Sequence, residues 1–279
     1  MHKLPLSNFL KLLMSFTVAL GCAAHAQLAP APSPSPAPQA IPPSISLSPA
    51  VVMAKGSFGQ GLTQVLTLTN NTGMDLAFEL QAQDIVVKDG KRTFATAGET
   101  PNSIAATAVF TPKSVLVKAH TTASAEVRLT IPAKTDLRAV SAIFMGTDKL
   151  QSSASNVAMT ASLAALITFN LTDNAKLQQE PAHVLPASET ANMTIRQWVA
   201  NVGSEPVLPE GTAAVLNAKG NLMGKTTFPQ QRLLPGERLE FSAEYPDQLQ
   251  PGDYRALCSF QYEGKVLTNT AEFKVDAKP

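Results

Sequence analysis

Short runs of alternating apolar and polar residues dominate the chain from residue 45 onward. Runs rich in Val, Ile, Thr and Phe follow one another as ISLSPAVV, TQVLTLTN, LAFELQAQDIVV, SVLVKA, SAEVRLTIP and VSAIFMG. Segments with Gly, Asn, Asp or Pro separate them, such as AKGSFGQG, NNTG, KDGK and PAKTD. A period of two between turn signals is typical of half-buried strands, so this region predicts an antiparallel β-sandwich. The polar stretch 95–108 is predicted to be a long loop.

The second half of the chain repeats this pattern with turns of its own. Its strand-like runs include ANMTIRQWVANVG, ERLEFSAEY and DYRALCSFQYEGKVLTNTAEFKV. In LQPGDYRALCSF, Tyr254 follows a Pro-Gly turn and shares a strand face with Cys258. A tyrosine in this place can bury its ring and donate its hydroxyl to the backbone, as in the tyrosine corner of immunoglobulin-like sandwiches. We therefore predict an all-β chain with two consecutive immunoglobulin-like sandwiches, over residues 44–172 and 173–279.

The N-terminal residues have the pattern of a secretory signal peptide over 1–26. Lys3 and Lys11 precede or flank an apolar run that is too short to cross a bilayer, and Ala24-His25-Ala26 supplies a small-x-small cleavage pattern. Cys22, in ALGC, gives a second possibility, lipidation of a bacterial lipobox. No later stretch holds about 18 consecutive apolar residues. We expect an exported chain, in the periplasm or at the cell surface of a bacterium, with no transmembrane segment after cleavage.

Proline alternates with Ala and Ser in QLAPAPSPSPAPQAIPP, residues 27–43. Proline fixes its own φ and biases the preceding residue toward extended conformations. This Pro/Ala/Ser-rich linker is therefore predicted to be a semi-rigid spacer between the signal peptide and the first sandwich.

Charge and reactive residues exclude several function classes. Without residues 1–26 the chain keeps 20 basic and 21 acidic side chains, so nothing favours nucleic acid or an anionic membrane as a partner. Cys258 is then the only cysteine, and His120 and His183 stand apart from other metal-binding residues. This pattern predicts no metal site, no cofactor and no nucleophilic catalysis. Convergence of the acidic residues Asp84, Asp89 and Glu99 stays open, but we expect a protein that is not an enzyme.

The longest alternating run is VAMTASLAALITFNLT, residues 157–172, with an apolar residue at every odd position. The fifteen residues 157–171, at about 3.3 Å each, extend well beyond a usual strand of five or six. Three interpretations stay open: a strand that offers its edge to a partner, a strand buried in its own core, and a helix. The candidate partner-binding residues are Val157, Met159, Leu163, Ile167 and Phe169.

The first sandwich, from ISLSP through VLTLTNNTGMDLAFELQA and AVSAIFMGT to this final run, resembles the PapD-like periplasmic pilus chaperones. It is less similar to the Gram-positive surface proteins that interact with WxL proteins, because those carry a C-terminal membrane helix. The chaperone resemblance implies that the final strand pairs with an incomplete subunit and lends it alternating apolar side chains. It also implies an arginine in the first strand and a lysine in the last, which bind the carboxylate of the subunit. Here no basic residue precedes Lys55 in the first strand, and 156–172 has none.

These observations predict a non-enzymatic exported protein that acts as a chaperone-like or assembly factor. Its partner would be another exported protein, such as a surface or pilus-type subunit, bound by β-strand pairing. The alternative is a structural or adhesive module of the cell envelope that binds polysaccharide or a surface protein. For that role Trp198, the only tryptophan, would have to offer an open ring face rather than pack in the core.

Overall fold

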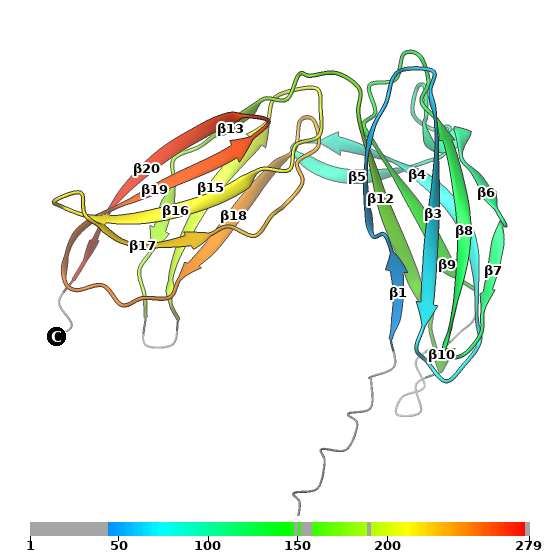
Figure 1. Cartoon of the computed structure of the whole chain (residues 1–279), viewed down its shortest axis with the longest axis horizontal. Coiled ribbons are helices and arrows are strands. Elements are labelled where there is room, and N and C mark those ends of the chain that lie inside the picture. The colour runs from blue at the N-terminus through cyan, green and yellow to red at the C-terminus, as the bar shows by residue number, and fades with distance from the viewer. Residues whose placement is uncertain (1–43, 148–149, 152–157, 189–190, 277–279) are drawn as a thin grey trace, which may run out of the picture. The chain divides into compact units, whose positions relative to one another are not determined.

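The computed structural model describes residues 44–147, 150–151, 158–188 and 191–276. Apart from one 3-10 turn, η1 (Ala105–Thr107), every regular element in these ranges is a β-strand. The strands form two sandwiches in succession along the chain (Figure 1), so the predicted all-β, immunoglobulin-like class is confirmed. The predicted signal peptide, the Pro-rich linker and Cys22 lie outside the described residues, and the domain limits stay a prediction.

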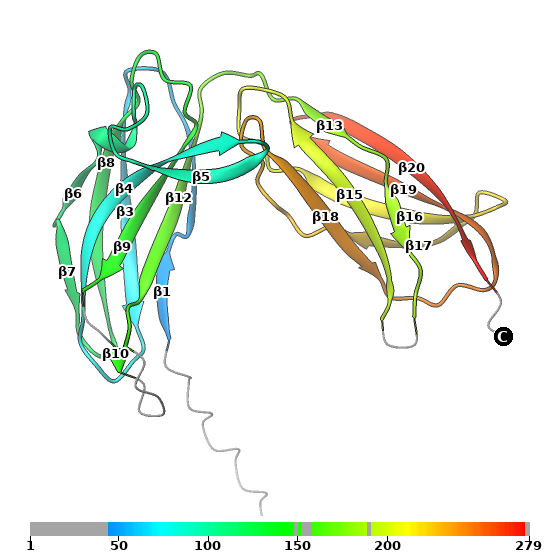
Figure 2. The ribbon, with the colours of Figure 1, turned by 180° about the vertical axis from the view of Figure 1, so that it is seen from behind.

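Two sheets build the first sandwich (Figure 2). The smaller sheet has the strand order β1 (Ile45–Ser48), β3 (Gly61–Asn70), β8 (Thr121–Thr130) and β6 (Val109–Thr111). The larger sheet has the order β2 (Val51–Lys55), β12 (Ser162–Asn170), β9 (Ala139–Gly146), β4 (Leu76–Lys88) and β5 (Lys91–Thr96), and β7 (Ser114–Val117) pairs with the start of β4. A separate short ladder joins β10 (Leu150–Gln151) to β11 (Ala158–Met159).

The second sandwich also has two sheets. One contains β13 (Leu177–Gln179), β14 (His183–Leu185), β15 (Met193–Asn201) and β18 (Arg238–Tyr245), with β15 in contact with the other three. The other has the order β17 (Leu222–Thr227), β16 (Glu210–Asn217), β19 (Gly252–Tyr262) and β20 (Lys265–Val275).

The first predicted strand is split in the structure. ISLSPAVV reads as one run, but β1 pairs antiparallel with β3 in one sheet, whereas β2 pairs parallel with β12 in the other. Proline at position 49 separates the two, and a proline has no N–H to donate to a sheet ladder. The chain therefore crosses from one sheet to the other at this point. A second difference is the predicted loop 95–108, which begins inside β5 and contains η1.

Each sandwich has its own apolar core. In the first, β3, β8, β9 and β12 contribute large side chains with no exposed surface, which include Leu66, Leu68, Leu129, Phe144 and Phe169. In the second, the rings of Phe228, Phe241 and Phe260 contact one another, with centroids 4.9 to 6.4 Å apart. Aromatic side chains bury much apolar area, so these clusters account for stability without a disulfide.

The predicted tyrosine corner is confirmed in the second sandwich. Tyr254 is 8% exposed, and its hydroxyl donates to the carbonyl of Gln250 at 2.7 Å. Cys258 lies further along β19 on the same face as Tyr254. It has no exposed surface, and burial raises the pKa of its thiol to about 11. The thiol is therefore a core group rather than a nucleophile.

Alkylation of Cys258 should depend on unfolding. At pH 8 a thiol with a pKa near 11 is about 0.1% thiolate, against roughly a quarter for an unfolded cysteine. We expect iodoacetamide to label the native protein at least about 100-fold more slowly than the urea-unfolded protein, measured by mass spectrometry. Equal labelling rates in the two states would show that this part of the core opens readily.

Gly146, the last residue of β9, should not tolerate a side chain. A Cβ there would stand 2.5 Å from the carbonyl oxygen of Ala161, which accepts the Gly146 N–H at 2.8 Å. Gly146→Ala is expected to destabilise the fold by about 1 to 3 kcal/mol in chemical denaturation. Gly73→Ala, where nothing lies within 4 Å of the added carbon, is the matched control and should change stability little. Equal effects of the two variants would contradict the close contact.

Candidate functional site

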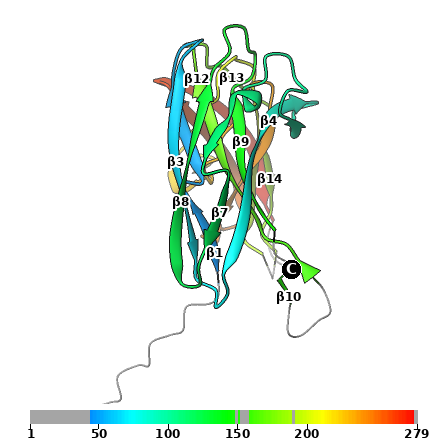
Figure 3. The ribbon, with the colours of Figure 1, turned by 90° about the vertical axis from the view of Figure 1, so that its right-hand side faces the viewer.

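The strand β12 runs beside β9 in the larger sheet (Figure 3), and it has neighbours on both sides for only part of its length. It pairs antiparallel with β9 from Ser162 to Thr168. On its other side it pairs with β2 from Leu166 to Asn170. Among the described residues, no strand pairs with Ser162–Ala165 on the side away from β9. The first half of β12 is therefore an open sheet edge.

Hydrogen bonds show which backbone groups face this edge. The Ala161 carbonyl accepts the N–H of Gly146 in β9, and the Phe169 N–H donates to the Arg138 carbonyl just before β9. The Leu166 N–H instead donates to the Ala50 carbonyl just before β2. Backbone groups alternate along a strand, so even-numbered residues of β12 point toward the side of β2. The N–H and C=O groups of Ser162 and Ala164 thus face the open side. Both side chains are exposed on the outer face of the sheet.

The structure distributes the predicted partner-binding residues over different environments. Leu163 is half-buried, and Ile167 and Phe169 have no exposed surface in the core of the first sandwich. Met159 belongs to β11, outside β12, and its side chain lies outside the described part of the chain, as does Val157. The helical interpretation is wrong for residues 162–170, which form a strand. The odd positions face inward, as the period of two predicts.

An apolar surface adjoins the open edge. Even-numbered β12 residues face outward, and the strand registers place Val51 and Met53 of β2 and Ile143 and Met145 of β9 on the same outer face. Val51 is 50% exposed, Met53 58% and Met145 42%. Large apolar side chains gathered on one face indicate a contact surface rather than scattered exposure. We call Val51, Met53, Ile143, Met145 and Ala164 the outer apolar face.

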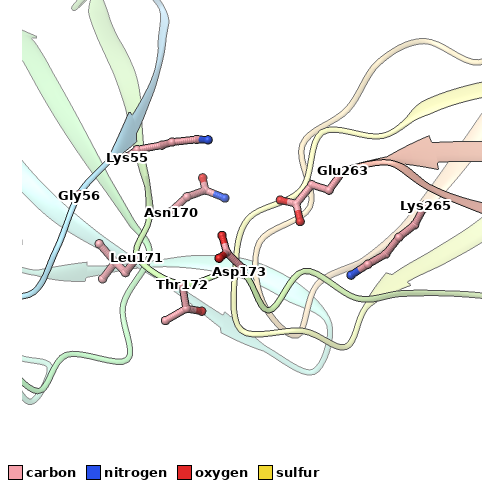
Figure 4. Close-up of a pocket in the computed structure, with 8 residues that line it drawn as sticks. All are labelled: Lys55, Gly56, Asn170, Leu171, Thr172, Asp173, Glu263 and Lys265. Atoms are coloured by element: carbon pink, nitrogen blue, oxygen red, sulfur yellow. The ribbon is translucent and has the colours of Figure 1, made fainter.

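At the far end of β12 an open cleft of about 640 Å³ is lined by residues from both sandwiches (Figure 4). Lys55 ends β2, Asn170 ends β12, and Glu263 and Lys265 come from the β19–β20 turn and the start of β20. Asn170, Asp173 and Glu263 point toward one space, while Leu171 points away (Figure 4). The cleft thus combines two lysines with two carboxylates. The ammonium of Lys265 already donates a hydrogen bond to the Ala175 carbonyl at 2.8 Å.

A buried carboxylate holds the end of β12. Glu205 has no exposed surface, and it forms an ion pair with Arg138 at 3.1 Å. Its oxygens also accept the Leu171 N–H and the Thr172 hydroxyl, both at 2.8 Å. Because all these donors belong to the segment around β9 and β12 while Glu205 follows β15, this group joins the two sandwiches. Sequence analysis missed it, since residues 67 positions apart carry no local signal.

A second buried carboxylate, Glu237, serves the β4–β5 hairpin. Arg92 of β5 places Nε 2.6 Å from Glu237 Oε1 and donates from Nη2 to Oε2 at 2.9 Å. The Leu234 N–H donates to the same Oε2. The Arg238 N–H also donates to the carbonyl of Gly90, at the tip of the hairpin. Beside these polar contacts, Ile85, Ala139 and Leu234 form a small apolar cluster with Val87 and Leu166.

One ring face of Trp198 is already covered by another side chain. It faces outward from β15, and the guanidinium of Arg238 lies 3.8 Å from its ring centroid. Arg238 is held in turn by two hydrogen bonds to Glu180. A guanidinium over an indole face is a favourable cation–π contact. The ring is therefore already covered on that side.

In the part of the chain that the structure describes, Asp84, Asp89 and Glu99 do not converge into one metal-binding group. Asp84, with no exposed surface, accepts the Thr100 hydroxyl and the Ala105 N–H, so it anchors the loop before η1. His120 stands in a turn with φ of 57°. Among the described residues no group of three or more His, Cys, Asp or Glu side chains could hold a metal ion, and no helix could span a membrane.

The sequence matches no known family model, and no curated protein matches it. Several solved structures are similar in fold. The class 5 fimbriae chaperone CfaA has a TM-score of 0.42 and 14% identity, covering 85% of this chain and 100% of that chain. The CupB2 chaperone of Pseudomonas aeruginosa has a TM-score of 0.37 and 11% identity, covering 82% and 100%. The E. coli chaperone DraB has a TM-score of 0.37 and 11% identity, covering 84% and 99%. All three of these structures are chaperones, and the likeness of this chain to each is one of fold alone.

Removing the charge of Glu205 should weaken the whole protein. Glu205→Gln leaves Arg138 buried, at 8% exposure, without its counter-charge. Loss of one partner from a buried ion pair typically costs about 3 to 5 kcal/mol. We expect a loss of that size in urea-induced unfolding. The matched control, Arg196→Gln, disrupts the exposed Arg196–Glu240 pair at 3.9 Å and should cost less than about 1 kcal/mol. Equal losses would mean that Glu205 is not a structural anchor.

Proposed function

We propose that this chain binds another exported protein by β-strand pairing along the open edge of β12. The observation that carries the proposal is the pair of backbone N–H and C=O groups at Ser162 and at Ala164, which face a side of the sheet with no neighbouring strand in the described residues. An unpaired edge is a template for strand addition, in which backbone hydrogen bonds supply affinity. The half-buried Leu163 would supply an apolar side chain where the partner strand meets β12.

Edge pairing alone is too weak for a stable complex. Four backbone hydrogen bonds contribute roughly 2 to 6 kcal/mol in total, because each adds a net 0.5 to 1.5 kcal/mol. Association costs about 4 to 15 kcal/mol in lost freedom of motion. A partner must therefore gain further energy from apolar burial. The outer apolar face, which borders the edge through Val51 and Met145, is the surface that supports this contribution.

The resulting role is that of a chaperone-like or assembly factor for a surface or pilus-type subunit, carried out after export to the periplasm or cell surface. The function is binding and not catalysis. Exposed edges and apolar faces promote aggregation unless a partner covers them, so a dedicated partner is consistent with both features.

The sharpest test is Ala164→Pro. Proline removes an N–H that faces the open side and leaves the ladder with β9 intact, since proline is tolerated in edge strands where the N–H faces solvent. We expect this variant to keep its circular dichroism spectrum and to lose the partner protein that co-purifies with the wild type from the secreted or periplasmic fraction. Quantitative mass spectrometry of the purified complexes measures the loss.

Ala164→Val is the matched control, because it keeps the N–H and adds a β-branched side chain that suits a strand. It should retain the partner. If Ala164→Pro is folded and retains the same partner as Ala164→Val, pairing at this edge is refuted. Met53→Lys tests the outer apolar face separately, and Met223→Lys, at a comparable 44% exposure in the second sandwich, is its control.

A further inference from the structure

One buried cation in the structure lacks a counter-charge. Arg232, just before the Leu233 bridge, is only 8% exposed. Its Nη1 donates to the hydroxyl oxygen of Thr168 at 3.3 Å, and its Nε is buried with no acceptor. No carboxylate among the described residues lies within ion-pairing distance of this guanidinium. The Thr168 hydroxyl is a neutral partner that itself donates to the Val52 carbonyl.

The neighbouring carboxylates are committed elsewhere. Both oxygens of Glu237 contact Arg92, and one also accepts the Leu234 N–H. Both oxygens of Glu205 are taken by Arg138, Leu171 and Thr172. Among the described residues, Arg92, Arg138 and Arg232 therefore share only the two buried carboxylates Glu205 and Glu237. The excess positive charge belongs to Arg232.

A buried charge without a counter-charge destabilises the folded protein. Removing an ion from water costs several kcal/mol unless a counter-ion or several hydrogen bonds offset it. Burial, followed by the nearby charge of Arg92, lowers the pKa of Arg232 below its ordinary value. Arginine nevertheless keeps its proton at neutral pH. The Arg232 side chain therefore stays positively charged, and a bound anion would stabilise it.

We propose that Arg232 is the core of a binding site for a small oxyanion of the phosphate or sulfate class, at the junction between β12 and the second sandwich. The planar guanidinium offers N–H donors in a fork that matches two oxygens of an oxyanion. Arg92 adds a second positive charge near the site, and the Thr168 hydroxyl fixes the orientation of the fork. The small exposed fraction of Arg232 limits the ligand to a few atoms. This site is separate from the strand edge, because Thr168 lies on the half of β12 that pairs with β2, and Arg232 and Arg92 lie outside β12.

Thermal unfolding in phosphate, sulfate, acetate and chloride, at one ionic strength and pH 7, tests the proposal. The wild type should show a saturable rise in Tm of a few degrees with phosphate or sulfate, a smaller rise with acetate and none with chloride, because a ligand of the native state stabilises by mass action. Arg232→Gln should lose the saturable rise. Arg128→Gln, which removes an exposed guanidinium from β8, is the matched control and should keep it.

Arg232→Met serves as a second variant of similar length if Arg232→Gln does not fold. In chloride it should unfold at the same temperature as the wild type or higher, since it removes an uncompensated buried charge. A saturable rise that persists in either Arg232 variant would overturn the proposal, as would the absence of any saturable rise in the wild type. A phosphate effect on the wild type alone, with a dissociation constant confirmed by isothermal titration calorimetry, would support it.

Discussion

The division of the first strand between two sheets is the constraint on which the rest of the first sandwich depends. β1 pairs with β3, and after Pro49 the chain crosses to pair in parallel with β12. Because β2 pairs only with Leu166–Asn170, it covers the second half of β12, and the first half has no neighbour on that side among the described residues. A longer β2 in the same sheet would remove the open edge, and its absence would expose the whole strand. The crossing of the chain at Pro49 thus determines how much of β12 is covered by β2 and how much is left for a partner.

The two halves of β12 have different outer environments for the same reason. Ser162 and Ala164 are exposed beside the outer apolar face. Further along, Leu166 contacts the small cluster around Leu234, and Thr168 receives the guanidinium of Arg232. One end of β12 therefore lies at an exposed surface, and the other end contacts the second sandwich.

The junction is held by charge as much as by apolar contact. Its apolar cluster is small, while Glu205 and Glu237 each bind an arginine and one or more backbone N–H groups. Buried carboxylates with several aligned donors define a geometry closely, because displacement leaves charges unsatisfied. The end of β12 at Leu171 is fixed directly by Glu205.

Local patterns were sufficient to predict much of the fold. The period of two identified the strands and the inward side of β12, and the Pro-Gly turn before Tyr254 indicated the tyrosine corner that the hydrogen bond to Gln250 confirms. These features depend on neighbours within a few residues, which a sequence displays directly. The same pattern could not say which part of 157–171 is covered, because an apolar residue in a strand suits its own core and a partner equally well.

The sequence by itself determined the all-β class, the near-neutral charge and the inward-facing residues of each strand. Tertiary structure alone decided that β2 covers half of β12, that Arg238 occupies the face of Trp198, and that Arg232 is buried without a carboxylate. Each of these depends on residues 30 or more positions apart. Alternation specifies the side of a strand to which a residue points, but only the folded chain specifies what lies on that side.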